Sequence, residues 1–144
     1  VEVAFDKSAP RELILTSYSD SALFPLVNEI AASCAGVEGW AIISLKPPRG
    51  FAFSISLGSH EISVNNLSFS PIPAIDGGVF IVLPDDAFQS AGTDTDAEEL
   101  AWLSVETGLG ERLTAKLQHV EFCPPGSTEE LRPIQELSDF AADL

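Results

Sequence analysis

Residues 11 to 47 decide the fold of this chain and read RELILTSYSDSALFPLVNEIAASCAGVEGWAIISLKP. Leu13 to Leu15 form a short, continuous apolar run, which is typical of a central strand buried on both faces. After an intervening helical pattern, Trp40 to Leu45 form a second apolar run. The stretch therefore predicts a strand, a helix and a second strand in succession.

The predicted helix has clear start and stop signals. Asp20 or Ser21 can cap its first turn, Pro25 is tolerable near that turn, and Gly36 is placed to end the helix. Apolar residues recur at helical spacing and predict one continuous buried stripe. The stripe consists of Leu23, Leu26, Val27, Ile30, Ala31 and Cys34. Packing is therefore the expected role of the Cys34 thiol.

The middle of the chain predicts antiparallel strands. From Phe51 to Leu57, apolar side chains alternate with alanine and serine, which is typical of a half-exposed strand. Together with residues 40–45 and 61–64, this strand is expected to form a meander. A further strand is predicted at residues 79–83, with a short edge partner near residues 72–75.

The last third of the chain predicts one helix, one strand and a tail. Residues 84–94 are rich in turn-forming residues and predict a loop, and a helix is expected from Thr95 to the glycines at 108 and 110. Residues 117–123 predict a last strand. The acidic tail, residues 124–144, carries apolar residues at three-residue spacing and predicts short helices packed on the body.

Taken together, these elements predict a single α+β domain over residues 1–144. We expect a mostly antiparallel or mixed sheet of five to six strands, with two main helices on one face and a short helical tail. The chain contains no repeat that would indicate a second domain.

The distribution of charge excludes several classes of partner. Ten acidic residues and no lysine or arginine lie between Arg49 and Arg112, and the whole chain has a net charge of −15. Such a chain repels phosphate backbones and anionic membrane surfaces, so neither nucleic-acid binding nor membrane binding is expected. No apolar run approaches the roughly 20 residues that span a bilayer.

Cysteine usage and the first residues predict a cytoplasmic location. Cys34 and Cys123 are too few for a disulfide scaffold and lack the spacing of zinc or redox motifs. The first residues show no basic segment followed by an apolar one, so no signal peptide is expected. The chain contains no methionine.

The leading hypothesis is a non-enzymatic protein-binding or regulatory module, like an inhibitor or immunity protein, that engages a basic partner through acidic side chains. No oligomeric state is predicted. The acidic residues expected to bind the partner are Asp85, Asp86, Asp94, Asp96, Glu98, Glu99 and Glu106. Their spacing does not match a calcium-binding loop, because glycine and a bidentate glutamate are missing where such a loop needs them. No metal or cofactor is therefore predicted.

The alternative hypothesis is a small hydrolase-like or metal-assisted enzyme. Its candidate residues are His60, His119 and the carboxylates around Asp94, with Cys123 as a nucleophile if its thiol meets a histidine. His60 begins an HExxH pattern that fails at Val64, which excludes a zinc protease of that class. Motifs for a nucleophile elbow and for a phosphate-binding loop are absent.

Three segments resemble a group of small bacterial α+β domains of unassigned function. They read LFPLVNEIAASCAGVEGWAIISLKP (residues 23–47), ETGLGE (residues 106–111) and LRPIQELSDF (residues 131–140). The resemblance covers most of the chain. It implies a strand-helix-strand opening, a second strand led by tryptophan and followed by a Pro-Arg turn, and an acidic close. It implies no activity and no catalytic residues.

Overall fold

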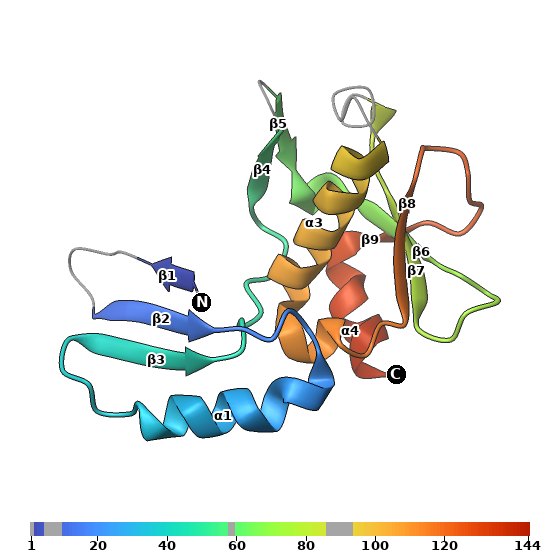
Figure 1. Ribbon diagram of the computed structural model, residues 1–144. Helices are drawn as coiled ribbons and strands as arrows, with labels where there is room; N and C mark the ends of the chain where they lie inside the picture. The colour runs from blue at the N-terminus through green and yellow to red at the C-terminus, as the bar shows by residue number, and fades with distance from the viewer. Residues whose placement is uncertain (1, 5–9, 58–59, 86–93) are drawn as a thin grey trace.

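The computed structural model describes residues 2–4, 10–57, 60–85 and 94–144, and its fold is of the α+β class (Figure 1). Its strands form a three-stranded sheet in the order β1-β2-β3, a β4-β5 hairpin and a four-stranded sheet in the order β8-β7-β6-β9. The long helix α3 runs between the three-stranded and four-stranded sheets (Figure 1). The predicted single sheet of five to six strands is therefore replaced by smaller sheets.

The N-terminal unit has the predicted order of strand, helix and strand. It comprises β1 (Glu2–Ala4), β2 (Arg11–Leu15), a 3₁₀ turn (Ser21–Leu23), α1 (Phe24–Ser33) and β3 (Trp40–Ser44). Strands β2 and β3 are parallel, and β1 is antiparallel to β2. The Asp20 carboxylate accepts a hydrogen bond from the Ala22 amide at 3.0 Å, so it caps the turn that leads into α1.

The apolar stripe of α1 is only partly buried, which corrects the expectation of one covered face. Val27 and Ala31 are buried, whereas Leu23, Leu26 and Ile30 are 43%, 52% and 43% exposed. Cys34 is half-buried. Helix α1 packs mainly against β3, so it contacts the sheet along one line of side chains, and the flanking part of its wide stripe faces outward.

The predicted meander is confirmed only in its second half: its last two strands pair as a hairpin, but in the described sheets β3 does not pair with β4. Strand β4 (Ser54–Leu57) pairs only with β5 (His60–Ser63), and a 3₁₀ turn (Val64–Asn66) follows. The segment before β4 instead runs alongside α3. There the Arg49 amide donates to the Thr107 carbonyl and the Gly50 amide donates to the Gly108 carbonyl, both at 3.1 Å.

The four-stranded sheet consists of β6 (Ser68–Pro71), β7 (Gly78–Val82), β8 (His119–Cys123) and β9 (Arg132–Pro133). Strands β7 and β8 are parallel, and the other pairs are antiparallel. The partner of β7 is therefore β6, and not residues 72–75, which form a turn closed by a hydrogen bond from the Ile75 amide to the Ile72 carbonyl at 3.0 Å. Pro71 is tolerated because β9 reaches only Ser68 and Phe69.

The main core lies between this sheet and two helices, α3 (Asp94–Thr114) and α4 (Leu137–Ala142), the latter preceded by a 3₁₀ turn (Ile134–Glu136). The tail packs into it through Ile134, Leu137 and Ala141, which are buried. The predicted loop falls mostly on residues 86–93, outside the described residues. No helix in the described ranges combines the length and the apolarity needed to cross a bilayer.

Candidate functional site

The Glu111 carboxylate is completely buried, with 0% of the residue exposed. Its Oε1 accepts hydrogen bonds from the Thr16 hydroxyl at 2.9 Å, from the Ser17 amide at 2.8 Å and hydroxyl at 3.1 Å, and from the Ser19 amide at 3.1 Å. Its Oε2 accepts a hydrogen bond from the Lys46 amide at 2.6 Å. The carboxylate therefore ties the loop after β2 and the segment after β3 to α3.

The protonation state of Glu111 follows from two opposing effects. Burial raises its pKa, because the charged form is removed from water. Hydrogen bonds from the Lys46, Ser19 and Ser17 amides and from the Thr16 hydroxyl favour the charged form and hold the pKa below its ordinary value of 4.5. Proton transfer near neutral pH needs a pKa close to that pH, so this carboxylate is suited to holding structure.

A second buried carboxylate, Glu106, lies earlier on α3 and is 4% exposed. It forms a salt bridge with Lys46, whose Nζ donates to Glu106 Oε2 at 2.9 Å. The Ser19 hydroxyl donates to Glu106 Oε1 at 3.3 Å, and the Lys46 ammonium lies 5.8 Å from the centre of the Tyr18 ring. Lys46 therefore contacts Glu106 through its side chain and Glu111 through its amide, which makes one connected polar network.

The backbone around this network adopts uncommon conformations. Tyr18, Ser19 and Leu45 are the described non-glycine residues with positive φ, at 56°, 63° and 65°. A left-handed conformation costs a non-glycine residue roughly 1–2 kcal/mol and persists where the surroundings enforce it. The hydrogen bonds of the Glu111 carboxylate to the neighbouring residues supply that constraint.

Two glycines in the ETGLGE stretch let the chain approach α3 closely. Gly110 has φ 70° and ψ 166°, a region essentially restricted to glycine, and a Cβ there would lie 2.6 Å from the Pro48 nitrogen. A Cβ on Gly108 would lie 2.1 Å from the Phe51 ring. The glycines thus admit the segment from Lys46 to Phe51, and the kink at Gly110 divides α3.

Two hollows border the segment after β3, because Lys46 and Pro47 line both of them. The smaller, of about 220 Å³, is lined by Ile14, Lys46, Pro47, Arg49, Leu103 and Thr107. The larger, of about 400 Å³, lies between the end of β3 and the C-terminal part of α3, and we call it the β3–α3 cavity. Its apolar lining consists of Ile43, Leu45, Pro47, Pro48, Leu109 and Leu113. Arg112 also lines it.

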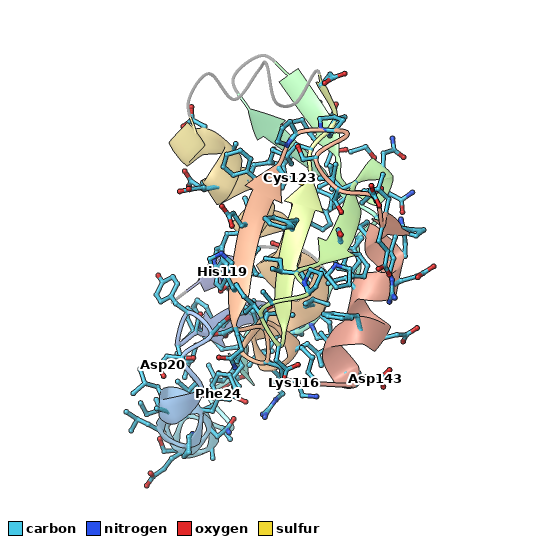
Figure 2. The ribbon with its side chains drawn as sticks, turned by 90° about the vertical axis from the view of Figure 1, so that its right-hand side faces the viewer. Asp20, Phe24, Lys116, His119, Cys123 and Asp143 are labelled. Carbon is cyan, nitrogen blue, oxygen red and sulfur yellow. The ribbon has the colours of Figure 1, made fainter. Side chains whose placement is uncertain are left out.

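The histidine and cysteine candidates do not form a shared site in the described residues. His119 and Cys123 lie at opposite ends of β8 (Figure 2). His119 Nε2 lies 3.1 Å from Glu121 Oε2, and both side chains are exposed. Cys123 is buried, and burial raises the pKa of its thiol, which the nearby Glu121 carboxylate raises further. His60 begins β5, and its side chain lies outside the description.

The acidic candidates divide into two groups. Asp85 follows β7, and Asp96, Glu98 and Glu99 lie at the start of α3. Asp85, Glu98 and Glu99 are exposed and make no side-chain contact of a polar or ionic kind with any described residue. Glu106 does not belong to this surface, because it is buried against Lys46. Asp86 and the side chain of Asp94 lie outside the description.

The described residues offer no obvious metal site. Within the described ranges, no group of three or more histidine, cysteine, aspartate or glutamate side chains gathers as metal ligands would. The two buried carboxylates bind donors from the protein itself, and no described buried polar side-chain atom lacks a hydrogen-bond partner.

Sequence analysis did not identify Glu111, Lys46 and the hydroxyls of residues 16–19 as a connected network. One signal was present, because Glu106 and Glu111 bracket the Gly108 and Gly110 pair. Glutamate is rarely buried, so its residue type alone favours a surface position. The partners also lie far apart in sequence, which no local pattern records.

Comparison with known proteins gave no relative for this chain: no protein family, curated protein or solved structure matches it.

Proposed function

We propose that this protein is a non-enzymatic binding module whose exposed acidic surface captures a basic protein partner, in the manner of an inhibitor or immunity protein. We define the acidic surface as Asp85, Asp96, Glu98 and Glu99. The observation that carries the proposal is that Asp85, Glu98 and Glu99 are exposed and have no partner among the described residues. Residues 50–111 contain no lysine or arginine that could neutralise them.

The proposed mechanism is association steered by charge. A net charge of −15 attracts a basic partner over a distance, and the acidic surface then orients it. Exposed charges interact over roughly one Debye length, about 10 Å at 0.1 M salt. The rate of association should therefore fall steeply as salt is added, while the rate of dissociation changes less.

The use of the buried charges supports a binding role over a catalytic one. Glu111 and Glu106 bind donors within the protein, and Cys123 is a buried thiol at neutral pH. Near the start of α3, Glu98 and Glu99 are exposed and make no polar or ionic side-chain contact with any described residue. A binding module can keep such groups dispersed, whereas an enzyme needs them to converge in a pocket.

The test compares two variants that remove the same amount of charge. The first changes the acidic surface and carries Asp85→Asn, Asp96→Asn, Glu98→Gln and Glu99→Gln. The second changes exposed acids elsewhere and carries Glu29→Gln, Glu38→Gln, Glu129→Gln and Glu136→Gln. Each immobilised protein is incubated with lysate at low and at about physiological salt, and bound proteins are identified by mass spectrometry.

A basic protein captured at low salt by the wild type and by the second variant, but not by the first, supports the proposal. If both variants lose capture equally, then net charge, and not this surface, is responsible. Capture of nothing at either salt would oppose the proposal and return attention to the alternative, a small hydrolase-like or metal-assisted enzyme. That alternative would then be tested by thermal-shift screening with metals and small molecules.

A further inference from the structure

A binding site of a different kind is suggested by the partners of the basic residues. Lys46 is paired with Glu106, and Arg132 is paired with Glu130 at 2.9 Å. Arg112 makes no salt bridge with any described residue. Arg49 likewise makes no salt bridge with any described residue, but of the two arginines only Arg112 lines the β3–α3 cavity.

The contacts of Arg112 leave most of its hydrogen-bonding capacity unused. A guanidinium group has five N–H donors. Among described residues, Arg112 donates only from Nη2 to Asn28 Oδ1, at 3.5 Å, which is long for a hydrogen bond. Its guanidinium carbon also lies 6.0 Å from the centre of the Phe24 ring. These contacts to α1 orient the side chain without neutralising its charge.

Arg112 lines the β3–α3 cavity, whose other walls are mostly apolar. The volume of about 400 Å³ is within the usual range for small-molecule sites, roughly 300–1,000 Å³. At about 30 Å³ per water in the liquid, it has room for roughly a dozen atoms of that size. Lys46 also lines the cavity, but its ammonium is paired with Glu106. A mostly apolar hollow whose lining includes one cation without a carboxylate partner among the described residues suits a molecule with one apolar and one anionic end.

The walls of this cavity are fixed before any ligand binds. Leu45 is held at positive φ, the Lys46 amide is bound by Glu111, and the Glu111 amide donates to the Lys46 carbonyl at 3.1 Å. Gly110 lets the backbone of Pro47 and Pro48 lie against α3. A preformed site saves the cost of ordering its walls when a ligand enters.

We propose that the β3–α3 cavity binds a small monocarboxylate with an apolar body, with Arg112 pairing the carboxylate. One unpaired cation matches one negative charge, and the net charge of −15 disfavours ligands with two or more. Guanidinium and carboxylate pair through two parallel hydrogen bonds, which a planar carboxylate accepts best. This site lies near the C-terminal end of α3, apart from the acidic surface at its start, and does not depend on the proposed function.

The test is isothermal titration calorimetry of the full chain with octanoate and with its uncharged counterpart octanamide. We expect saturable binding of octanoate with a Kd on the order of 0.1–1 mM, which is reasonable for a ligand of this size. Octanamide should bind at least about fivefold more weakly, because it lacks the charge-assisted hydrogen bonds. Arg112→Gln should weaken octanoate binding by a similar factor and leave octanamide unchanged.

Arg49→Gln is the matched control, because Arg49 is also exposed and unpaired among described residues but lines the smaller hollow. It should bind octanoate like the wild type. Loss of octanoate binding in both arginine variants would show a general charge effect and overturn the proposal. Equal binding of octanoate and octanamide would also overturn it, as would the absence of saturable heat with octanoate. Both substituted side chains are exposed, so folding is expected to survive and is checked by thermal unfolding.

Discussion

Glu111 carries the most specific structural role of any side chain in the described residues. Five hydrogen bonds from four residues converge on its two oxygens. Removing an acceptor while its donors stay buried costs more free energy than the hydrogen bonds contributed. The donors are then left with neither water nor protein to bind. The stability of the connection between the N-terminal unit and α3 should therefore depend strongly on this one carboxylate.

Glu111→Gln should lower the free energy of unfolding at pH 7 by about 2–4 kcal/mol. Glutamine has nearly the same shape, but it replaces one acceptor oxygen with an NH₂ group that faces N–H and O–H donors. Urea unfolding followed by circular dichroism measures the change. Glu129→Gln, at an exposed position, should alter stability by less than about 0.5 kcal/mol. An equally small effect at Glu111 would contradict this structural role.

The same variant should also change how stability depends on pH. The folded pKa of Glu111 is below its ordinary value of 4.5, so the unfolded chain takes up the proton first as the pH falls. The stability that the charged Glu111 carboxylate provides is therefore fully present above the ordinary pKa of 4.5 and is lost as the pH falls through the folded pKa. The difference in stability between wild type and Glu111→Gln should narrow as the pH falls below 4.5 and through the folded pKa. A constant difference would show that the carboxylate charge is not what stabilises the fold.

Gly110→Ala should destabilise the fold by about 2–4 kcal/mol, because alanine must adopt a conformation nearly restricted to glycine and its Cβ meets the Pro48 backbone. Gly36→Ala is the matched control, since Gly36 also has positive φ, at +87°, but has no neighbour within 4 Å. Its cost should be near 1 kcal/mol. Equal melting temperatures for the two variants would contradict close packing at Gly110.

Sequence patterns predicted the elements of this fold far better than their pairing. The order of β2, α1 and β3 is confirmed, because continuous apolar runs and caps are local signals. The predicted pairing of β3 with β4 is wrong, because the segment between them is bonded to α3: the Arg49 and Gly50 amides donate to the Thr107 and Gly108 carbonyls. Competition between a strand and a helix for the same donors is a tertiary effect, and the alternation in residues 51–57 contains no sign of it.

The apolar stripe of α1 shows the same limit within one element. Helical spacing correctly placed apolar residues along one side of α1, but spacing does not reveal how much of that side a neighbouring sheet covers. Burial therefore differs between adjacent residues, from 8% exposed at Val27 to 52% at Leu26. The two positions should contribute very differently to stability.

Val27→Ala should lower the free energy of unfolding by about 1.5–2.5 kcal/mol, because the apolar area that it removes is buried. Leu26→Ala removes a larger side chain from a mostly exposed position and should cost less than about 1 kcal/mol. Helix propensity rises more for Val→Ala than for Leu→Ala, by a few tenths of a kcal/mol, so it works against the expected difference and does not produce it. Chemical unfolding compares them directly, and a larger loss at Leu26 would mean that α1 packs through a different face.

The molecule as a whole combines a well-formed core with strong self-repulsion. Phe69, Val79, Ile81 and Leu109 are nearly or completely buried, while the chain carries a net charge of −15. Repulsion between like charges disfavours the compact state, and salt screens it over about 10 Å at 0.1 M. The buried Lys46–Glu106 pair is screened much less, because solvent ions do not enter its surroundings.

Sodium chloride should therefore raise the melting temperature, by a few degrees between about 10 mM and about 300 mM. For a chain of this size, 1 kcal/mol shifts the melting temperature by roughly 2–5 °C. The variant with Glu29→Gln, Glu38→Gln, Glu129→Gln and Glu136→Gln carries four fewer negative charges and should show a higher melting temperature at low salt and a smaller rise. Because all four side chains are exposed, they contribute little packing, and the comparison isolates repulsion. A flat or falling melting temperature in the wild type would mean that local ion pairs, and not the net charge, set the electrostatic contribution to stability.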